Sequence, residues 1–414
     1  MKRNQFFRFV RVIFSVLLPM LTSCTSPTGV GTTQPSSPDQ VATIVAATMQ
    51  ALSTNTPAAV TPAAPAELLP HSLYYLGEDR HVFRMERDGK TVTQISNEDN
   101  VTDFDVSPVD GSVAYMAYNQ MLLVNADGSN PRVLVDAWPR ENNPWITSPV
   151  FSPNGRTLAF GYKGLNLYDI SSGVSKLVIE DQWTDPVPDG GRLPIETYSP
   201  ESYSPDGTKL LLALGHWESA PLHAVYYPDT PALVRYEEVK DYIYCCSFHG
   251  GPVWSPDSAS FYGVASVHDT GYQTGELWRI DAGNGAVTRM LRTEVFSTGI
   301  GTAYLPKEIY LAPDGHLYFF FGTYQTDSGY WDAPVLNLVR SGPDGVTDRT
   351  VLRDENFRLL NEALWAPDAS FVITATWPGL NWDRNGGVLE LYYTDRQKGA
   401  VWLAPFGQQM KWGP

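Results

Sequence analysis

Cysteine is scarce in this chain: Cys24, Cys245 and Cys246 are the three among 414 residues. No two of them have the CxxC spacing of zinc-binding and redox motifs, so a cysteine-rich zinc module and a disulfide-dense scaffold are excluded. Basic residues are also few, with 29 Lys and Arg against 45 Asp and Glu, for a net charge of −16. A surface of this sign disfavours nucleic acid and anionic lipid as partners.

The common catalytic motifs are missing as well. The chain has no GxSxG nucleophile elbow, no HExxH zinc motif, no GxxxxGK[ST] phosphate loop and no EF-hand loop. These absences exclude several large enzyme classes. We therefore expect no cofactor and favour a role other than catalysis, although the question stays open.

One short pattern is present six times: a hydrophobic residue, Ser-Pro or Ala-Pro, a polar turn and then an apolar run, as in FSPNGRTLAF at 151–160. The residue before each proline is Ser107, Ser152, Ser204, Ser255, Ala312 or Ala366. Proline, Asp or Asn, and Gly are the residues that tight turns require, and the apolar run predicts a buried strand. A motif repeated at intervals of roughly fifty residues indicates a repeat architecture.

Each repeat continues with a second strand pattern, a tight turn such as Asp127-Gly128, and a final strand, giving four strands per unit. Residues 71–96 read as three strands only, and the terminal Trp412-Gly413-Pro414 has the form of a truncated motif. We therefore predict an all-β domain over residues 70–414. It would be a seven-bladed β-propeller closed by its C-terminal strand, with six or eight blades as alternatives.

These SPDG-type turns in four-strand units resemble the TolB-like and WD-like propeller repeats, which also occur in the propellers of prolyl oligopeptidases. The resemblance covers roughly residues 70–414. Three turns depart from it: Val109-Asp110 replaces Asp-Gly in one, and Ser258 and Ala369 stand where glycine is usual in the other two. It implies a fold and hardly constrains function, since propellers serve in binding, scaffolding and catalysis alike.

The first 23 residues read as a signal peptide, with a basic start followed by the short apolar run Val12–Leu21. Leu21-Thr22-Ser23-Cys24 resembles a bacterial lipobox, which implies cleavage before Cys24 and a palmitate-type lipid on that residue. A plain signal peptide followed by a chance cysteine is the alternative. Residues 24–69 are rich in Ser, Thr, Pro and Ala and predict a disordered linker. We expect an extracytoplasmic, monomeric protein held at the bacterial cell membrane by lipid.

The adjacent Cys245 and Cys246 leave three interpretations open. They are two small buried thiols, a strained vicinal disulfide in an oxidising compartment, or, with His249, part of a metal site. His216, His249 and His268 fall in neighbouring predicted loops and are weak candidates for a metal cluster. We predict no metal site.

Long loops are predicted at one end of the domain, opposite the Ser-Pro turns, and they carry many aromatic and charged residues. The candidate ligand-binding residues there are Trp183, Trp217, Tyr272, Tyr324, Tyr330, Trp331, Asp332, Trp377, Trp382, Asp383 and Arg384. Flat aromatic rings beside carboxylates suit sugar rings or a peptide. We expect this end to bind a glycan, a peptide or an envelope protein. A propeller lyase or glycoside hydrolase and a non-catalytic envelope scaffold are the alternatives.

Overall fold

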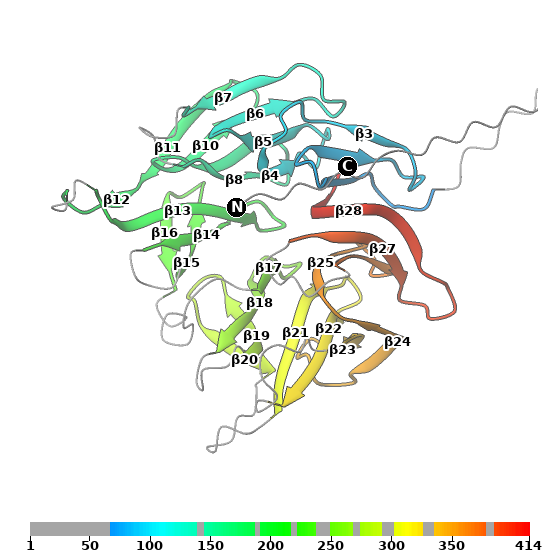
Figure 1. The fold of residues 1–414 in the computed structure, drawn as a ribbon. Coiled ribbons are helices and arrows are strands. Elements are labelled where there is room, and N and C mark those ends of the chain that lie inside the picture. Colours follow the sequence, from blue (N-terminus) through cyan, green and yellow to red (C-terminus); the bar gives the residue numbers. More distant parts are fainter. Residues whose placement is uncertain are drawn as a thin grey trace, which may run out of the picture. The chain divides into compact units, whose positions relative to one another are not determined.

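The computed structural model describes nine segments of the chain, and their regular secondary structure is entirely β-strand (Figure 1). The segments are residues 67–138, 145–186, 191–216, 222–236, 249–267, 274–291, 302–325, 335–377 and 385–414. Pro65–Pro414 forms one compact unit. Within the described segments no helix is long and apolar enough to span a membrane. The predicted signal peptide and Cys24 lie outside these segments, as does nearly all of the predicted linker.

The strands form six antiparallel sheets. The first two contain β4 (Val101–Val106), β5 (Val113–Ala117), β6 (Gln120–Val124) and β7 (Arg132–Asp136), and then β8 (Thr147–Phe151), β9 (Thr157–Gly161), β10 (Gly164–Asp169) and β11 (Val174–Glu180). A five-stranded sheet contains β12 (Gln182–Trp183), β13 (Pro194–Tyr203), β14 (Leu210–Gly215), β15 (Leu222–Tyr227) and β16 (Ala232–Arg235).

The next two sheets contain β17 (His249–Trp254), β18 (Ser260–Val267), β19 (Thr274–Asp281) and β20 (Val287–Leu291), and then β21 (Thr302–Leu311), β22 (Leu317–Gln325), β23 (Leu336–Ser341) and β24 (Thr350–Phe357). A seven-stranded sheet contains β25 (Leu360–Trp365), β26 (Phe371–Thr376), β27 (Gly387–Tyr393), β28 (Val401–Trp412), β1 (Leu73–Leu76), β2 (Val82–Met85) and β3 (Val92–Gln94).

The Ser-Pro turn joins two neighbouring strands of a sheet at each of its six occurrences, as the repeat predicts. In one of these turns the Ser152 N–H donates to the carbonyl of Thr157 at 2.8 Å, and the Gly155 N–H donates to the carbonyl of Ser152 at 2.8 Å. Gly155 has a φ of 66°, which glycine adopts without strain. Ser258 and Ala369 occupy the equivalent position with φ of 58° and 57°. The two turns that lack glycine therefore keep the backbone geometry of the motif.

The first strands of successive sheets contact one another. The series of contacts runs from β4 through β8, β13, β17, β21 and β25 to β28, and then from β28 back to β4. Buried apolar side chains fill the space between neighbouring sheets; Leu211 and Val225, for example, pack with Phe261 and Trp278. Most of the hydrophobic core thus lies between sheets, where its burial stabilises their association.

The aromatic residue before the Ser-Pro turn links neighbouring sheets. The indole N–H of Trp254 donates to the hydroxyl of Ser202 at 3.0 Å, and that of Trp365 donates to the carbonyl of Glu308 at 2.8 Å. The indole N–H of Trp412 donates in turn to the carbonyl of Trp365 at 2.7 Å. At these three positions the indole therefore bonds to the first strand of the preceding repeat.

The last strand belongs to two parts of its sheet. Near its start β28 pairs with β27, through Leu389 and Ala404, and near its end it pairs with β1, through Leu73 and Trp412. Figure 1 shows β28, in red, beside β27. The predicted pairing between the C-terminal strand and the first strand of the domain is therefore present.

Several predicted loops contain more strand than expected. The sequence predicts long loops at 181–199 and 293–308, but the first contains β12 and the first half of β13, and β21 begins within the second. Both β13 and β21 are ten residues long and contain a break in register. Such a break interrupts the alternation of apolar and polar residues, so the sequence pattern does not predict these strands in full.

Candidate functional site

A register irregularity interrupts the pairing of the first strand of each sheet with its neighbour. It lies close to the residue four positions before the Ser or Ala of the turn motif. At this position Ser148, Gly251, Glu308 and Gln409 have φ of 42°, 76°, 52° and 53°. A bulge of this kind redirects side chains away from simple alternation. Here the redirected polar groups reach neighbouring sheets.

Carboxylates on these first strands accept hydrogen bonds from the backbone of the next first strand. Glu308 Oε2 on β21 accepts the N–H of Ala363 on β25 at 3.1 Å. Glu362 on β25 accepts the N–H of Gln409 at 2.6 Å and also that of Met410, both on β28. Each carboxylate therefore joins two first strands and satisfies backbone donors at the bulge of the second one.

Asp105 completes this arrangement between β4, β8 and β28. Its Oδ2 accepts the N–H of Phe151 at 2.6 Å, and its Oδ1 accepts a hydrogen bond from Lys411 Nζ at 2.8 Å. The side chains of Lys411 and Asp105 are 32% and 16% exposed. A charge-assisted bond of this length is among the stronger polar contacts in proteins. It connects the C-terminal strand to the sheet of β4–β7.

Burial perturbs the ionisation of these groups. It raises the pKa of Glu308 to about 7, and it raises the pKa of Glu362 and of Asp103 as well. Burial also acts to lower the pKa of Lys411, but the charges of Asp105 and Asp103 outweigh it and the net shift is upward. Perturbed pKa values occur at catalytic sites and in structural ion networks alike. Because the bonded carboxylates hold backbone N–H groups, we assign them to joining the sheets.

A second polar cluster lies where β13 begins, at the end of the sheet opposite the Ser-Pro turn. Arg235 donates two hydrogen bonds to Glu196, with Nε to Oε2 at 3.0 Å and Nη2 to Oε1 at 2.6 Å. The hydroxyl of Tyr198 also donates to Glu196. The Arg235 side chain is 40% exposed, whereas that of Glu196 is 10% exposed. The cluster therefore presents a guanidinium to solvent over a fixed carboxylate.

Trp183 lies beside this cluster. It belongs to β12, which pairs with β13 through Gln182 and Glu196 and through Trp183 and Pro194. Trp183 is 39% exposed and neighbouring Ile195 is 48% exposed. An exposed indole next to an oriented ion pair offers a stacking surface together with hydrogen-bonding groups. We call Trp183, Glu196, Tyr198, Arg235 and His216 the β13 cluster.

His216 follows β14 and acts on the same carboxylate. Hydrogen bonds from Arg235 lower the pKa of Glu196, and the charge of His216 contributes in the same direction. Burial raises the pKa of Tyr198 to about 12, so its hydroxyl is a donor at neutral pH. Nε2 of His216 is buried and has no hydrogen-bond partner within the described segments. Two sequence candidates, Trp183 and His216, are thus brought together around Glu196.

The other candidates are distributed as follows. Trp377 is half-buried, and its ring packs against that of Phe406 with centroids 6.2 Å apart, so it contributes to packing. His249 lies in β17 and Tyr324 in β22, but their side chains lie outside the described part of the structure. The remaining candidates outside the described segments are Trp217, Tyr272, Tyr330, Trp331, Asp332, Trp382, Asp383, Arg384, Cys245, Cys246 and His268.

Metal binding by described residues finds no support in their geometry. Within the described segments no three His, Cys, Asp or Glu side chains are placed to hold one ion. His216 is the member of the proposed histidine set whose side chain can be assessed. The other two histidines and the cysteine pair stay predictions.

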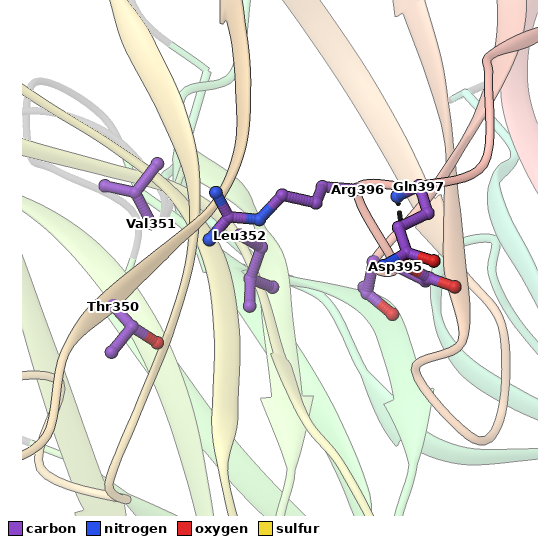
Figure 2. A pocket seen from close by; sticks show the side chains of 7 residues that line it. Thr350, Val351, Leu352, Asp395, Arg396 and Gln397 are labelled. Carbon is purple, nitrogen blue, oxygen red and sulfur yellow. Dashed lines mark hydrogen bonds between the residues drawn. The ribbon is translucent and has the colours of Figure 1, made fainter.

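An open groove of about 410 Å³ lies away from both polar clusters (Figure 2). It is lined by Thr350, Val351, Leu352, Thr394, Asp395, Arg396 and Gln397. These residues come from β24 and from the turn between β27 and β28, and Figure 2 shows the Arg396 side chain extending toward Leu352. Arg353 holds this turn: its Nη1 donates to the carbonyls of Tyr393 at 2.8 Å and Lys398 at 2.9 Å.

Sequence reasoning missed Glu196, Tyr198 and Arg235, because the charged partners lie 39 residues apart on β13 and β16. No local motif signals such a pair. The groove was missed for a similar reason, since its residues belong to a strand and a tight turn that the repeat assigns to structure alone. Glu196-Thr197-Tyr198 has no alternation of apolar and polar residues, so no local signal marked this part of β13.

No protein-family model and no curated protein sequence matches this chain. Among solved structures it is similar to TolB from Acinetobacter baumannii, with a TM-score of 0.43, 16% identity, and coverage of 84% of this chain and 68% of that one. For oligogalacturonate lyase from Vibrio parahaemolyticus the TM-score is 0.49, the identity 10%, and the coverage 80% of this chain and 84% of the lyase.

The β-propeller domain of Cps50 (Swd1) from Myceliophteria thermophila is similar with a TM-score of 0.41 and 14% identity, over 76% of this chain and 87% of that domain. Identities and TM-scores this low support no inference about ligand, activity or partner. The site residues of this chain therefore have to be judged on their own geometry.

Proposed function

We propose that this chain is an extracytoplasmic bacterial lipoprotein whose seven-bladed β-propeller binds a ligand at the end opposite its Ser-Pro turns. The seven-stranded sheet divides into two four-stranded blades if β28 is counted in both, since it pairs with β27 and with β1. With the other five sheets this makes seven blades. The contacts that return from β28 to β4 are those a closed ring requires.

The lipid anchor is proposed from the sequence. Cys24 follows an apolar run and a lipobox-like Leu-Thr-Ser, and the Ser/Thr/Pro/Ala-rich residues after it suit a tether. In a bacterial host, the Cys24→Ala variant should move from the membrane fraction to the soluble extracytoplasmic fraction. Retention of the variant in membranes would contradict lipidation at this residue.

The binding role rests on one observation above all: the exposed Trp183 lies on the strand that pairs with β13, and β13 carries the ion pair of Glu196 with Arg235. An ion pair fixed by a tyrosine hydroxyl orients polar ligand groups, while the indole supplies apolar contact. The ligand classes that fit are a glycan, a peptide or a segment of an envelope protein. Because the bonded carboxylates of the first strands join the sheets, they give the enzymatic alternative no support.

The test combines Trp183→Ala with Arg235→Ala. The purified full chain is screened for ligands among glycans and peptides by thermal shift, since a ligand present at 100 times its Kd stabilises the folded state by about 2.7 kcal/mol. The double variant should lose that shift. Arg235→Ala also leaves the carboxylate of Glu196, whose side chain is 10% exposed, without its cation, so the unliganded melting temperature of the double variant should fall. The single variant Trp183→Ala should weaken the ligand shift while its unliganded melting temperature changes little, because Trp183 is 39% exposed. A control variant, Trp402→Ala, removes a tryptophan that is 59% exposed on β28. An unchanged ligand shift in the double variant would show that the β13 cluster does not bind it.

A further inference from the structure

A different group of aromatic residues lies near the connection between the sheet of β4–β7 and the sheet of β8–β11. Tyr118, Trp138 and Trp145 are 41%, 58% and 53% exposed, and the rings of Tyr118 and Trp138 meet nearly at right angles with centroids 6.2 Å apart. They come from the turn between β5 and β6 and from the connection between β7 and β8. Both connections lie at the end opposite the Ser-Pro turns. Large apolar side chains gathered at the surface are the exception that marks binding sites.

One buried amide fixes the backbone on which these three rings stand. Asn119 is 8% exposed, and its Nδ2 donates to the carbonyl of Ala137 at 2.9 Å while its Oδ1 accepts the N–H of Ile146 at 3.0 Å. Its carbonyl accepts the N–H of Ala137 at 3.2 Å as well. Tyr118, Trp138 and Trp145 are the chain neighbours of Asn119, Ala137 and Ile146. These hydrogen bonds fix the backbone next to the exposed rings before a ligand binds, and a preformed backbone lowers the entropy cost of binding.

The turn that presents Tyr118 is unusual. Tyr118 and Asn119 have φ of 52° and 58° between the paired residues Ala117 and Gln120. A two-residue hairpin turn of this type favours Asn and Gly, and an aromatic residue in the left-handed region is strained. Tyr118 is thus poorly suited to its turn. Local strain of this kind is concentrated at functional sites.

Polar groups around the rings offer both donors and acceptors. The hydroxyl of Tyr118 donates to Asp99. Asp136 Oδ1 accepts bonds from the amide of Gln120 at 3.0 Å and from the N–H of Trp138 at 3.2 Å. Sugar hydroxyls need such a mixed set, whereas a cation needs acceptors alone. The carboxylates, together with the net charge of −16, would repel a uronate or a phosphate.

We propose that Tyr118, Trp138 and Trp145, with Asp99, Gln120 and Asp136, form a binding subsite for a neutral oligosaccharide. The C–H faces of its sugar rings stack on the indoles, and its hydroxyls bond to Asp136 and Gln120. This inference refines the proposed ligand-binding role by naming the ligand class, but it uses residues separate from the β13 cluster.

The experiment titrates the full chain with hexasaccharides of β1,4-linked glucose and of N-acetylglucosamine, followed by tryptophan fluorescence and calorimetry. Trp138→Ala should weaken binding about tenfold, the effect of losing one aromatic stacking contact. Trp138→Phe should recover part of the affinity, and Trp402→Ala should leave it unchanged. A hexamer of galacturonate and a lysine-rich peptide serve as charged comparison ligands and should bind more weakly than the neutral sugars.

Three outcomes overturn the inference: no binding of either neutral hexasaccharide at millimolar concentration, equal binding by wild type and Trp138→Ala, or preference for the peptide. Because Trp138 is exposed, loss of folding is not expected, and melting temperatures of each variant check this. If Trp183→Ala with Arg235→Ala abolishes ligand binding while Trp138→Ala does not, the β13 cluster is the binding site. The subsite at Trp138 is then refuted, and the proposed ligand-binding function stands. Sugar binding that depends on Trp138 but not on Trp183 would support the subsite and remove the β13 cluster.

Discussion

Glu362 allows the contribution of the first-strand carboxylates to be measured. Its two oxygens accept the backbone N–H groups of Gln409 and Met410, on the part of β28 that pairs with β1. Glu362→Ala removes both acceptors and leaves two donors facing a small space. The substitution therefore tests whether a side chain on β25 holds the C-terminal strand in place.

The magnitude follows from the two lost acceptors. A buried donor left without a partner costs about 1–3 kcal/mol, so two of them cost roughly 2–6 kcal/mol. Removing a carboxylate whose pKa is raised by burial returns part of that amount, so we expect Glu362→Ala to lower the free energy of unfolding by about 2–4 kcal/mol. Glu362→Gln keeps one acceptor oxygen and should cost about 1–2 kcal/mol.

Urea unfolding of the purified full chain, followed by tryptophan fluorescence, measures these differences. Glu180→Ala is the matched control, because Glu180 is exposed near the end of β11 and surface substitutions of this kind change stability by about 0.5 kcal/mol at most. If Glu362→Ala matched the control, the carboxylate would not hold β28, and the assignment of these groups to joining sheets would be refuted.

Three further predictions concern the same architecture. The pKa of Glu308 is raised from its usual 4.5 to about 7, so the native state binds the proton more tightly and stability from this group is lost as pH rises through that window; Glu308→Gln should flatten this dependence in unfolding curves at pH 4 to 8, and an unchanged slope would contradict it. Removing residues 408–414 should abolish cooperative unfolding, because β1 loses its pairing with β28; an unaltered melting temperature would refute the closure. Arg353→Ala should destabilise the domain by about 2–4 kcal/mol and expose the β27–β28 turn to protease, because three carbonyls lose their buried donor; protease resistance equal to wild type would contradict it.

The sequence predicted the parts of this fold that depend on local turn chemistry. The Ser-Pro motif predicted the turn between two strands at each of its six positions, where the structure has one. The long first strands were not predicted, because their bulges break the alternation on which strand recognition depends. The loop-bearing end was predicted only by composition, and of its candidates Trp183 and His216 come together around Glu196.

The remaining parts of the candidate sites depend on long-range pairing. Arg235 meets Glu196 across two intervening strands, and Asn119 meets Ile146 across two sheets. The sequence around each of these four residues contains no pattern that predicts its hydrogen-bond partner. Trp138 and Trp145 are not among the candidates predicted from the sequence, because Asn119 connects their chain neighbours Ala137 and Ile146 through contacts that no local pattern signals.

The shared use of β28 has a consequence for how the domain is made. Lys411 and Asp105, which bond to each other, lie 306 positions apart in the chain. β1 pairs with β2, but its other edge is paired only when β28 is present. β1 is synthesised before β28, so one edge of β1 stays unpaired until β28 has been made. Contacts this distant in sequence make folding slow, and a waiting strand edge invites mispairing. Under the proposed export route this delay favours translocation, because a chain that cannot complete the sheet of β1 before β28 is made does not fold fully before it crosses the membrane.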